Sequence, residues 1–162
     1  MKLRLSVGEI PKSGYCNIDP IPKMNGDAGL TVKPIDFRVL DFFDISKDAE
    51  CTEVLIDGAI DYVSSESLLS FLQYFCKKLR KYGEIHINGL DINEVARYIY
   101  NDEISEESAN QVLFGRQDSA WNFKNGCHSM RKVTNILSSL GITVTSKKIN
   151  GFYYSISGKR DE

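Results

Sequence analysis

The stretch "LSVGEIPKSGYCNID", residues 5 to 19, contains the residues best suited to ligand chemistry. Gly8 follows a strand-like alternation of apolar and polar residues, and a glycine at such a point lets the backbone approach a ligand closely. Asp19 ends a second short strand-like run. A nucleotide-type glycine loop normally opens a helix, but too few residues separate Gly8 from Asp19 for a helix. The stretch therefore predicts two strand ends that lie close together.

Further candidate residues follow other predicted strands. The segments 35–45 and 53–60 are apolar enough for buried strands, and both lead into aspartates. Because ligands of parallel sheets bind at the carboxyl ends of the strands, the site is expected at Gly8, at Asp19, from Asp41 to Asp44 and from Asp57 to Tyr62. Aspartate is also common at strand exits as a turn residue, so each carboxylate has a structural interpretation beside the functional one.

The elements that must position these residues alternate between strands and helices. The clearest helix is 64–83, in which apolar residues repeat at intervals of three and four and Gly83 ends the pattern. A strand at 84–91 follows, and Asp91 is a plausible N-cap with Glu94 three residues on. Further helices are predicted over 92–100, over 106–114 after Ser105, and over 129–140 after Ser129.

The last part of the chain predicts an antiparallel hairpin. Two strand-like runs, about 142–148 and 152–157, are joined by Asn150-Gly151, which is a strong hairpin signal. The whole pattern predicts an α/β fold with a Rossmann-like, mainly parallel sheet, a C-terminal antiparallel hairpin and three layers. A length of 162 residues suits a single domain spanning 1–162.

Composition excludes several functions. The net charge of -2 gives no general attraction to nucleic acid or to an anionic membrane. The four cysteines form no CxxC pair, which favours reduced thiols over a zinc site or disulfides. No apolar run approaches the roughly 20 residues that a membrane span needs. The sequence thus predicts a soluble cytoplasmic protein that binds no metal.

Several motifs in order resemble the class I S-adenosylmethionine-dependent methyltransferases, in particular small variants with a shortened first crossover. The opening "LSVGEIPKSGYCNID" resembles their first loop and second strand, and "CTEVLIDGAIDYV" resembles the end of their fourth strand. "LLSFLQYFCKKLRKYGEIHI" resembles the helix and turn that lead into strand five. The similarity covers nearly the whole chain and lies in the order of these motifs.

The resemblance implies S-adenosylmethionine as the cofactor. In such a protein Gly8 would lie under the methionine end, and Asp19 would hold the ribose hydroxyls. Ser6 stands in the place of the first glycine of the usual fingerprint. Asp41, with Asp44 as its competitor, would lie near the adenine. Ile56, Asp57 and Gly58 would form the floor beside the cofactor.

The resemblance also implies a methyl acceptor, expected to be a small molecule or glycan-like. Methyl transfer depends mainly on alignment of the reactants, and a base is needed only if the acceptor loses a proton. The candidates for catalysis are Asp61, Tyr62 and His128, whereas His86 fits a structural role inside its strand. Trp121 is either an aromatic platform for the acceptor or a packing residue. The segment 115–128 would cover the acceptor.

Two alternatives stay open at this point. Ser6 and the absence of both histidines of the H-x-x-E-H pattern, here Gly58 to Tyr62, allow a binding or scaffold module that has lost catalysis. A different nucleotide-binding protein is disfavoured because the sequence has no G-x-x-x-x-G-K-[ST] loop. The short first crossover would leave one face of the first two strands uncovered, and this apolar face could form a homodimer.

Overall fold

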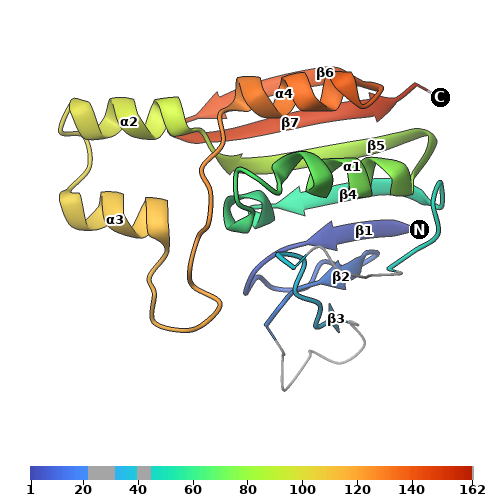
Figure 1. Cartoon of the computed structure of the whole chain (residues 1–162), viewed down its shortest axis with the longest axis horizontal. Helices are drawn as coiled ribbons and strands as arrows, with labels where there is room; N and C mark the ends of the chain where they lie inside the picture. Colours follow the sequence, from blue (N-terminus) through green and yellow to red (C-terminus); the bar gives the residue numbers. More distant parts are fainter. Residues whose placement is uncertain (22–31, 40–44, 162) are drawn as a thin grey trace.

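The computed structural model describes residues 1–21, 32–39 and 45–161. Within these residues one seven-stranded sheet has the strand order β3-β2-β1-β4-β5-β7-β6 (Figure 1). Strands β1 to β5 pair in parallel, whereas β7 runs antiparallel to both β5 and β6. The fold is a Rossmann-like α/β fold with the C-terminal hairpin that the sequence predicts. The strands are β1 (Lys2–Leu5), β2 (Cys16–Ile18), β3 (Val32–Lys33), β4 (Cys51–Asp57), β5 (Leu79–Leu90), β6 (Ile142–Asn150) and β7 (Tyr153–Arg160).

Two helices cover one face of this sheet. Helices α1 and α4 lie side by side over it (Figure 1). Phe75 of α1 and Leu137 of α4 are buried in one core cluster with Val54, Ile56 and Ile87 of the central strands. Helices α2 and α3 instead lie beyond the carboxyl end of β5. The helices are η1 (Ala59–Tyr62, a 3-10 turn), α1 (Leu68–Lys78), α2 (Ile92–Tyr100), α3 (Glu106–Phe114) and α4 (Met130–Ser139).

The opposite face of the central strands is mostly polar. Because side chains alternate along a strand, the register places Arg4, Leu55 and His86 in one row across β1, β4 and β5. Of the three expected layers, the described residues supply the sheet and the α1–α4 layer. A face on which polar side chains pair with one another has little apolar area to bury under a third, helical layer.

The segment from Ser6 to Tyr15 contains no helix and lies over this polar face near β1 and β2. The Arg4 guanidinium donates to the carbonyl of Ile10. The Asn17 side chain accepts from the amide of Lys12 and donates to the carbonyls of Lys12 and Tyr15. Arg4 and Asn17 are buried and polar, so this face of β1 and β2, which the sequence predicted to be uncovered and apolar, is covered and polar here.

Helix and hairpin boundaries follow the sequence closely. Asp91 and Ser105 cap α2 and α3 with their side chains, as predicted, and the predicted ranges of both helices are confirmed. Ser129 caps α4 in the same way. The hairpin forms where the sequence predicts it, but its turn residues are Gly151 and Phe152, because Asn150 still pairs with Tyr153. β6 and β7 end two and three residues beyond the predicted ranges, and β7 begins one residue later than predicted.

Two predicted elements need correction. The described part of the strand expected at 35–45 is a turn, because Phe37 leaves the sheet and packs against Phe71 with ring centroids 6.1 Å apart. Residues 40–44 lie outside the described residues. The helix expected over 64–83 ends at Lys78, because Leu79 pairs with Cys51 in the sheet.

We predict that Asp91→Ala lowers the free energy of unfolding by about 2 to 4 kcal/mol, the sum of a lost cap and an unsatisfied buried amide. Its carboxylate accepts from the amides of Asn93 and Glu94 in α2 and also from the amide of Met130 at the start of α4. Ser105→Ala is the matched control, because Ser105 accepts from the single amide of Ser108. Urea unfolding that gives equal losses for both variants would contradict the double role of Asp91.

Candidate functional site

The carboxyl ends of β1 and β4 surround a cavity of about 200 Å³, which we call the strand-end cavity. Its acidic lining comes from Glu9 after β1, from Asp57 at the end of β4 and from Asp61 in η1. Gly58 and Tyr62 complete the β4 side. Ligands of open parallel sheets bind at such an edge, so this cavity is the expected place for a cofactor. The remaining lining residues are Val7, Lys124 and Tyr153.

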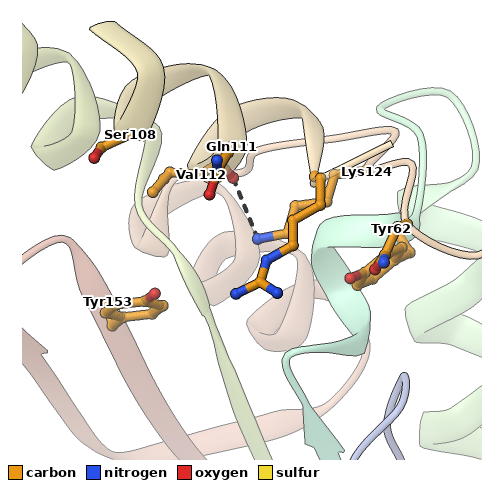
Figure 2. A pocket seen from close by; sticks show the side chains of 9 residues that line it. Tyr62, Ser108, Gln111, Val112, Lys124 and Tyr153 are labelled. Carbon is orange, nitrogen blue, oxygen red and sulfur yellow. Dashed lines mark hydrogen bonds between the residues drawn. The ribbon is translucent and has the colours of Figure 1, made fainter. Parts of the chain in front are cut away.

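A second cavity of about 340 Å³ adjoins the first, between α3, the segment 115–124 and β7; we call it the helix-loop cavity. The two cavities share Tyr62, Lys124 and Tyr153 in their linings. Figure 2 shows Tyr62 and Tyr153 on opposite sides of the helix-loop cavity, with the Lys124 side chain between them in this view. A molecule in one cavity can therefore meet a molecule in the other.

Asp19 and Gly8 lie together, as the sequence predicts, but they bind each other. The Gly8 amide donates to Asp19 Oδ2 at 2.8 Å, and the Ile21 amide donates to Oδ1 at 2.9 Å. Asp19 is only 1% exposed. Gly8 has φ of 74°, a left-handed conformation that favours glycine. The Asp19 carboxylate thus holds the left-handed loop in place, and the ribose contact expected of it has no open approach in this structure.

The other expected cofactor residues divide into three groups. Ser6 is buried at the exit of β1, where its amide donates to the carbonyl of Ile18, and it lines neither cavity. Asp41 and Asp44 lie outside the described residues. Asp57 and Gly58 do line the strand-end cavity.

Asp57 is held by an ion pair across the sheet. The Arg4 guanidinium donates to Asp57 Oδ2 from Nε at 3.0 Å and from Nη2 at 2.7 Å. The Asp57 side chain keeps 33% exposure, whereas that of Arg4 keeps 8%. Both donors bind the same oxygen, and Oδ1 accepts from the side chain of Asn88 at 3.4 Å, so both carboxylate oxygens have a partner. Asp57 therefore presents a fixed negative charge to the cavity.

Gly58 leaves open space beside that charge. It has φ of 69°, and a Cβ atom added to it would meet no atom within 4 Å. The glycine thus meets both the conformational demand of the turn into η1 and the demand for room at the cavity wall. A side chain at this position would meet open space beside the cavity lining.

Asp61 is the most perturbed carboxyl group at the site. Its Oδ1 accepts from the Leu90 amide at 3.1 Å, and its Oδ2 lies 3.8 Å from Nζ of Lys124. Burial raises its pKa to about 6, although Lys124 and the Leu90 amide oppose the rise. Burial and the charge of Asp61 also raise the pKa of Tyr62. Asp61 can therefore exchange a proton near neutral pH, the property required of a general base.

His128 does not reach either cavity. It is buried, and its Nε2 lies 2.8 Å from the carbonyl oxygen of Val63, to which it donates. Burial lowers its pKa and keeps the ring neutral. The contact ties the segment before α4 to the end of η1. The structure therefore does not bring His128 together with the cavity residues, and its catalytic role stays a prediction.

Trp121 also lies away from both linings. Its ring packs on the Arg38 guanidinium, whose central carbon lies 4.8 Å from the ring centroid. Arg38 also forms an ion pair with Asp36. The contact fastens the segment 115–128 to the turn after β3. Of the two interpretations from the sequence, packing therefore describes Trp121 in this structure. His86 lies beside Ser157 in the sheet, with Nδ1 and Oγ 2.9 Å apart.

Sequence reasoning missed Lys124 and Tyr153, which line both cavities. Lys124 lies within the covering segment 115–128 but has no motif around it. Tyr153 comes from β7, whose first residues follow the Asn150-Gly151 turn. A hairpin signal predicts pairing, and it does not say that the hairpin end reaches the site. Neither residue could be selected without the topology.

None of the described helices is long and apolar enough to cross a membrane. No known protein family matches this sequence, and no curated protein matches it. Solved structures do resemble it. An S-adenosylmethionine-dependent methyltransferase from Mesorhizobium loti aligns with a TM-score of 0.63 and 11% identity over 98% of this chain and 90% of that one. One from Methanosarcina mazei aligns with a TM-score of 0.59 and 10% identity over 98% and 92%.

A third neighbour is the 1,6-didemethyltoxoflavin-N1-methyltransferase of Burkholderia thailandensis, solved with 1,6-didemethyltoxoflavin and S-adenosylhomocysteine bound. It aligns with a TM-score of 0.59 and 9% identity over 91% of this chain. This chain spans only 61% of that protein's length. At such identities the likeness establishes the fold, and it confirms at that level the resemblance to class I methyltransferases drawn from the sequence.

We predict that Asp61→Asn becomes more stable relative to the wild type as the pH rises from about 4 to 7. The folded pKa, about 6, lies above the ordinary value of 3.8, so the native state binds the proton more tightly than the unfolded state. In the wild type, the protonated Asp61 carboxyl contributes fully to the free energy of unfolding at pH values below 3.8, its ordinary pKa. This contribution is lost as the pH rises through 6. The full change is about 3 kcal/mol.

Urea unfolding across this pH range measures the effect. Asp102→Asn is the matched control, because Asp102 is exposed on the turn after α2. If the difference in the free energy of unfolding between Asp61→Asn and the wild type stays constant with pH, the pKa of Asp61 is the same in the folded and unfolded states, and the prediction is wrong.

Proposed function

We propose that this chain is an S-adenosylmethionine-dependent methyltransferase, with the methionine end of the cofactor in the strand-end cavity and the acceptor in the helix-loop cavity. The observation that carries the proposal is the pair of adjoining cavities at the carboxyl ends of the parallel strands, joined at Tyr62, Lys124 and Tyr153. The fold neighbours supply the cofactor class, since they are S-adenosylmethionine-dependent enzymes. They give no support to a scaffold module without catalysis.

The charges that line the strand-end cavity suit the cationic groups of this cofactor. Glu9, Asp57 and Asp61 supply carboxylates, and Lys124 is the cation among the lining residues. The sulfonium and the ammonium group of S-adenosylmethionine are cationic and attract these carboxylates where water is partly excluded. The methionine carboxylate has the opposite charge, and Glu9 would repel it, whereas Lys124 would attract it. The open space beside Gly58 gives the ligand room.

Bound S-adenosylmethionine would supply an electrophilic methyl group, which the acceptor's lone pair attacks while the electron pair of the carbon–sulfur bond stays on sulfur. The chain's own part is alignment and proton transfer. Tyr62 and Tyr153 limit the acceptor on two sides at the junction of the cavities. Asp61 lines the strand-end cavity alone, so it can take a proton from an acceptor hydroxyl or amine that reaches the junction of the cavities. Its pKa of about 6 leaves it ionised at neutral pH.

We assign the Asp19–Gly8 contact a positioning role. By holding the Gly8 amide, the buried carboxylate fixes the loop that carries Val7 and Glu9 into the cavity wall. This explains how the chain forms a cofactor edge without a helix in its first crossover. The loop keeps its left-handed glycine and gains a side-chain anchor in place of a helix N-terminus.

The acceptor is proposed to be a small molecule. The helix-loop cavity, about 340 Å³, lies within the range of small-ligand sites. Ser108, Gln111 and Asn122 line it with hydroxyl and amide groups, which a glycan-like acceptor could also use. We further propose a cytoplasmic location, because all four cysteines are free thiols.

We predict that Gly58→Val weakens S-adenosylmethionine binding at least about tenfold, because the side chain would occupy the cavity wall. Gly14→Val is the matched control. Gly14 also has a positive φ and open space around an added Cβ, but it lines neither cavity. Calorimetric titration of both variants with S-adenosylmethionine and S-adenosylhomocysteine measures the effect. If the wild type binds neither compound at millimolar concentration, the proposed function is wrong.

We predict that Asp19→Ala weakens S-adenosylmethionine binding by about 1.5 to 3 kcal/mol through the Gly8 loop, the range for a hydrogen bond to a charged group. Hydrogen exchange distinguishes positioning from direct contact. A positioning role requires faster exchange of the Gly8 amide in the variant without any ligand present. Unchanged exchange together with lost affinity would instead assign Asp19 to the ligand itself.

A further inference from the structure

The helix-loop cavity differs from its neighbour in charge. Two cations line it, Arg116 and Lys124, and no carboxylate does. The chain as a whole has a net charge of -2, so this local excess of positive charge is not a general property of the surface. The other lining residues are neutral: Tyr62, Ser108, Gln111, Val112, Gly115, Asn122 and Tyr153.

The backbone brings the two cations to the same cavity. The segment after α3 folds back on itself, with the Lys124 amide donating to the carbonyl of Phe114 at 3.1 Å and the Gln117 amide donating to that of Asn122 at 3.0 Å. Gly115 permits this close approach, because its φ is 78° and an added Cβ would lie 2.2 Å from the Asn122 carbonyl oxygen. Arg116 and Lys124 therefore come from opposite arms of one closed loop.

The charges of the two cations are only partly compensated. Arg116 has no ion-pair partner among residues 1–21, 32–39 and 45–161. Nζ of Lys124 donates to the carbonyl of Val112 at 3.2 Å (Figure 2) and lies 3.8 Å from Asp61. Asp61 belongs to the lining of the strand-end cavity alone. The helix-loop cavity thus offers a guanidinium and an ammonium group to whatever enters it.

We propose that the methyl acceptor carries an oxyanion, a carboxylate or a phosphate, that Arg116 and Lys124 bind in the helix-loop cavity. This inference rests on the proposed function, since it names the substrate class of the same site. Guanidinium and ammonium groups pair with such oxyanions through charge-assisted hydrogen bonds. The amide of Gln111, which lines the same cavity, can donate a further hydrogen bond.

The positions of the two cations also orient the acceptor. Of these two cavities Arg116 lines the helix-loop cavity alone, whereas Lys124 lines both. Arg116 also lines a neighbouring cavity on the side of Glu107 and Gln117. An oxyanion held mainly by Arg116 therefore lies at the end away from the cofactor edge. The nucleophilic oxygen or nitrogen of the acceptor then points toward the junction at Tyr62 and Tyr153. The substrate class is a compact molecule with an oxyanion at one end and the methylated atom at the other.

Titration of the full chain with benzoate, inorganic phosphate and benzamide, monitored by NMR of the backbone amides, tests the proposal without cofactor. Benzamide has the shape of benzoate but no charge. We expect benzoate or phosphate to shift the NMR signals of the Arg116 and Lys124 amides, and benzamide to leave these signals unchanged.

A pair of variants tests the role of the guanidinium. Arg116→Gln should weaken oxyanion binding about tenfold, the effect of one lost charge-assisted contact. Arg131→Gln, an exposed change on α4 away from both linings, should have no effect.

Two results would overturn the inference: equal binding of benzoate and benzamide, or no binding of either oxyanion at millimolar concentration. Lys124→Arg keeps the charge and should retain oxyanion binding, whereas Lys124→Gln should lose it. Calorimetry with S-adenosylmethionine on Arg116→Gln separates this inference from the proposed function. Cofactor affinity should be unchanged there, and a wild type that binds oxyanions but no cofactor would overturn the proposed function alone.

Discussion

The contacts of Asp61 fix the relative positions of three parts of the site. Its carboxylate accepts from Leu90 at the end of β5, and its own backbone carbonyl accepts from the amides of Asn125 and Gly126. Asp61 itself lies in η1, directly after β4. One buried residue thus joins two strand ends to the segment that covers them, and it places Lys124 at the junction of the two cavities. Moving this residue would change both cavities together.

The cofactor edge depends on a second constraint, which replaces a missing helix. In a helix-opening loop, backbone amides at the helix N-terminus are organised by the helix itself. Here the segment after β1 has no helix, and its Gly8 amide is held by the Asp19 carboxylate from the next strand. Arg4 supports the same edge by pairing with Asp57 from the polar face of the sheet. Buried polar contacts, each satisfied by a partner, give this short loop a single conformation.

Sequence patterns predicted the elements that depend on local rules. The caps Asp91, Ser105 and Ser129 and the Asn150-Gly151 turn are local signals, and the structure confirms the elements that they predict. The sequence also placed some residues of the candidate cavity together, although their roles stay predictions. Asp57, Gly58, Asp61 and Tyr62 meet in one cavity because the carboxyl ends of parallel strands share an edge. The side chains of His128 and Trp121 face other partners, Val63 and Arg38, and residue type alone gives no direction to a side chain in an irregular segment.

The two cavities divide opposite charges between them, and Lys124 stands at the boundary. Its ammonium group faces Asp61 on the acidic side and the helix-loop cavity on the other. In the site that we propose, a cationic methyl donor and an anionic acceptor would lie side by side, and this arrangement would oppose binding of either molecule in the wrong cavity, because each would meet its own sign of charge. Electrostatics would then decide which molecule binds in which cavity and how it is oriented there, and close shape complementarity would not be needed. A chain that has no helix in its first crossover can in this way align two reactants with few residues.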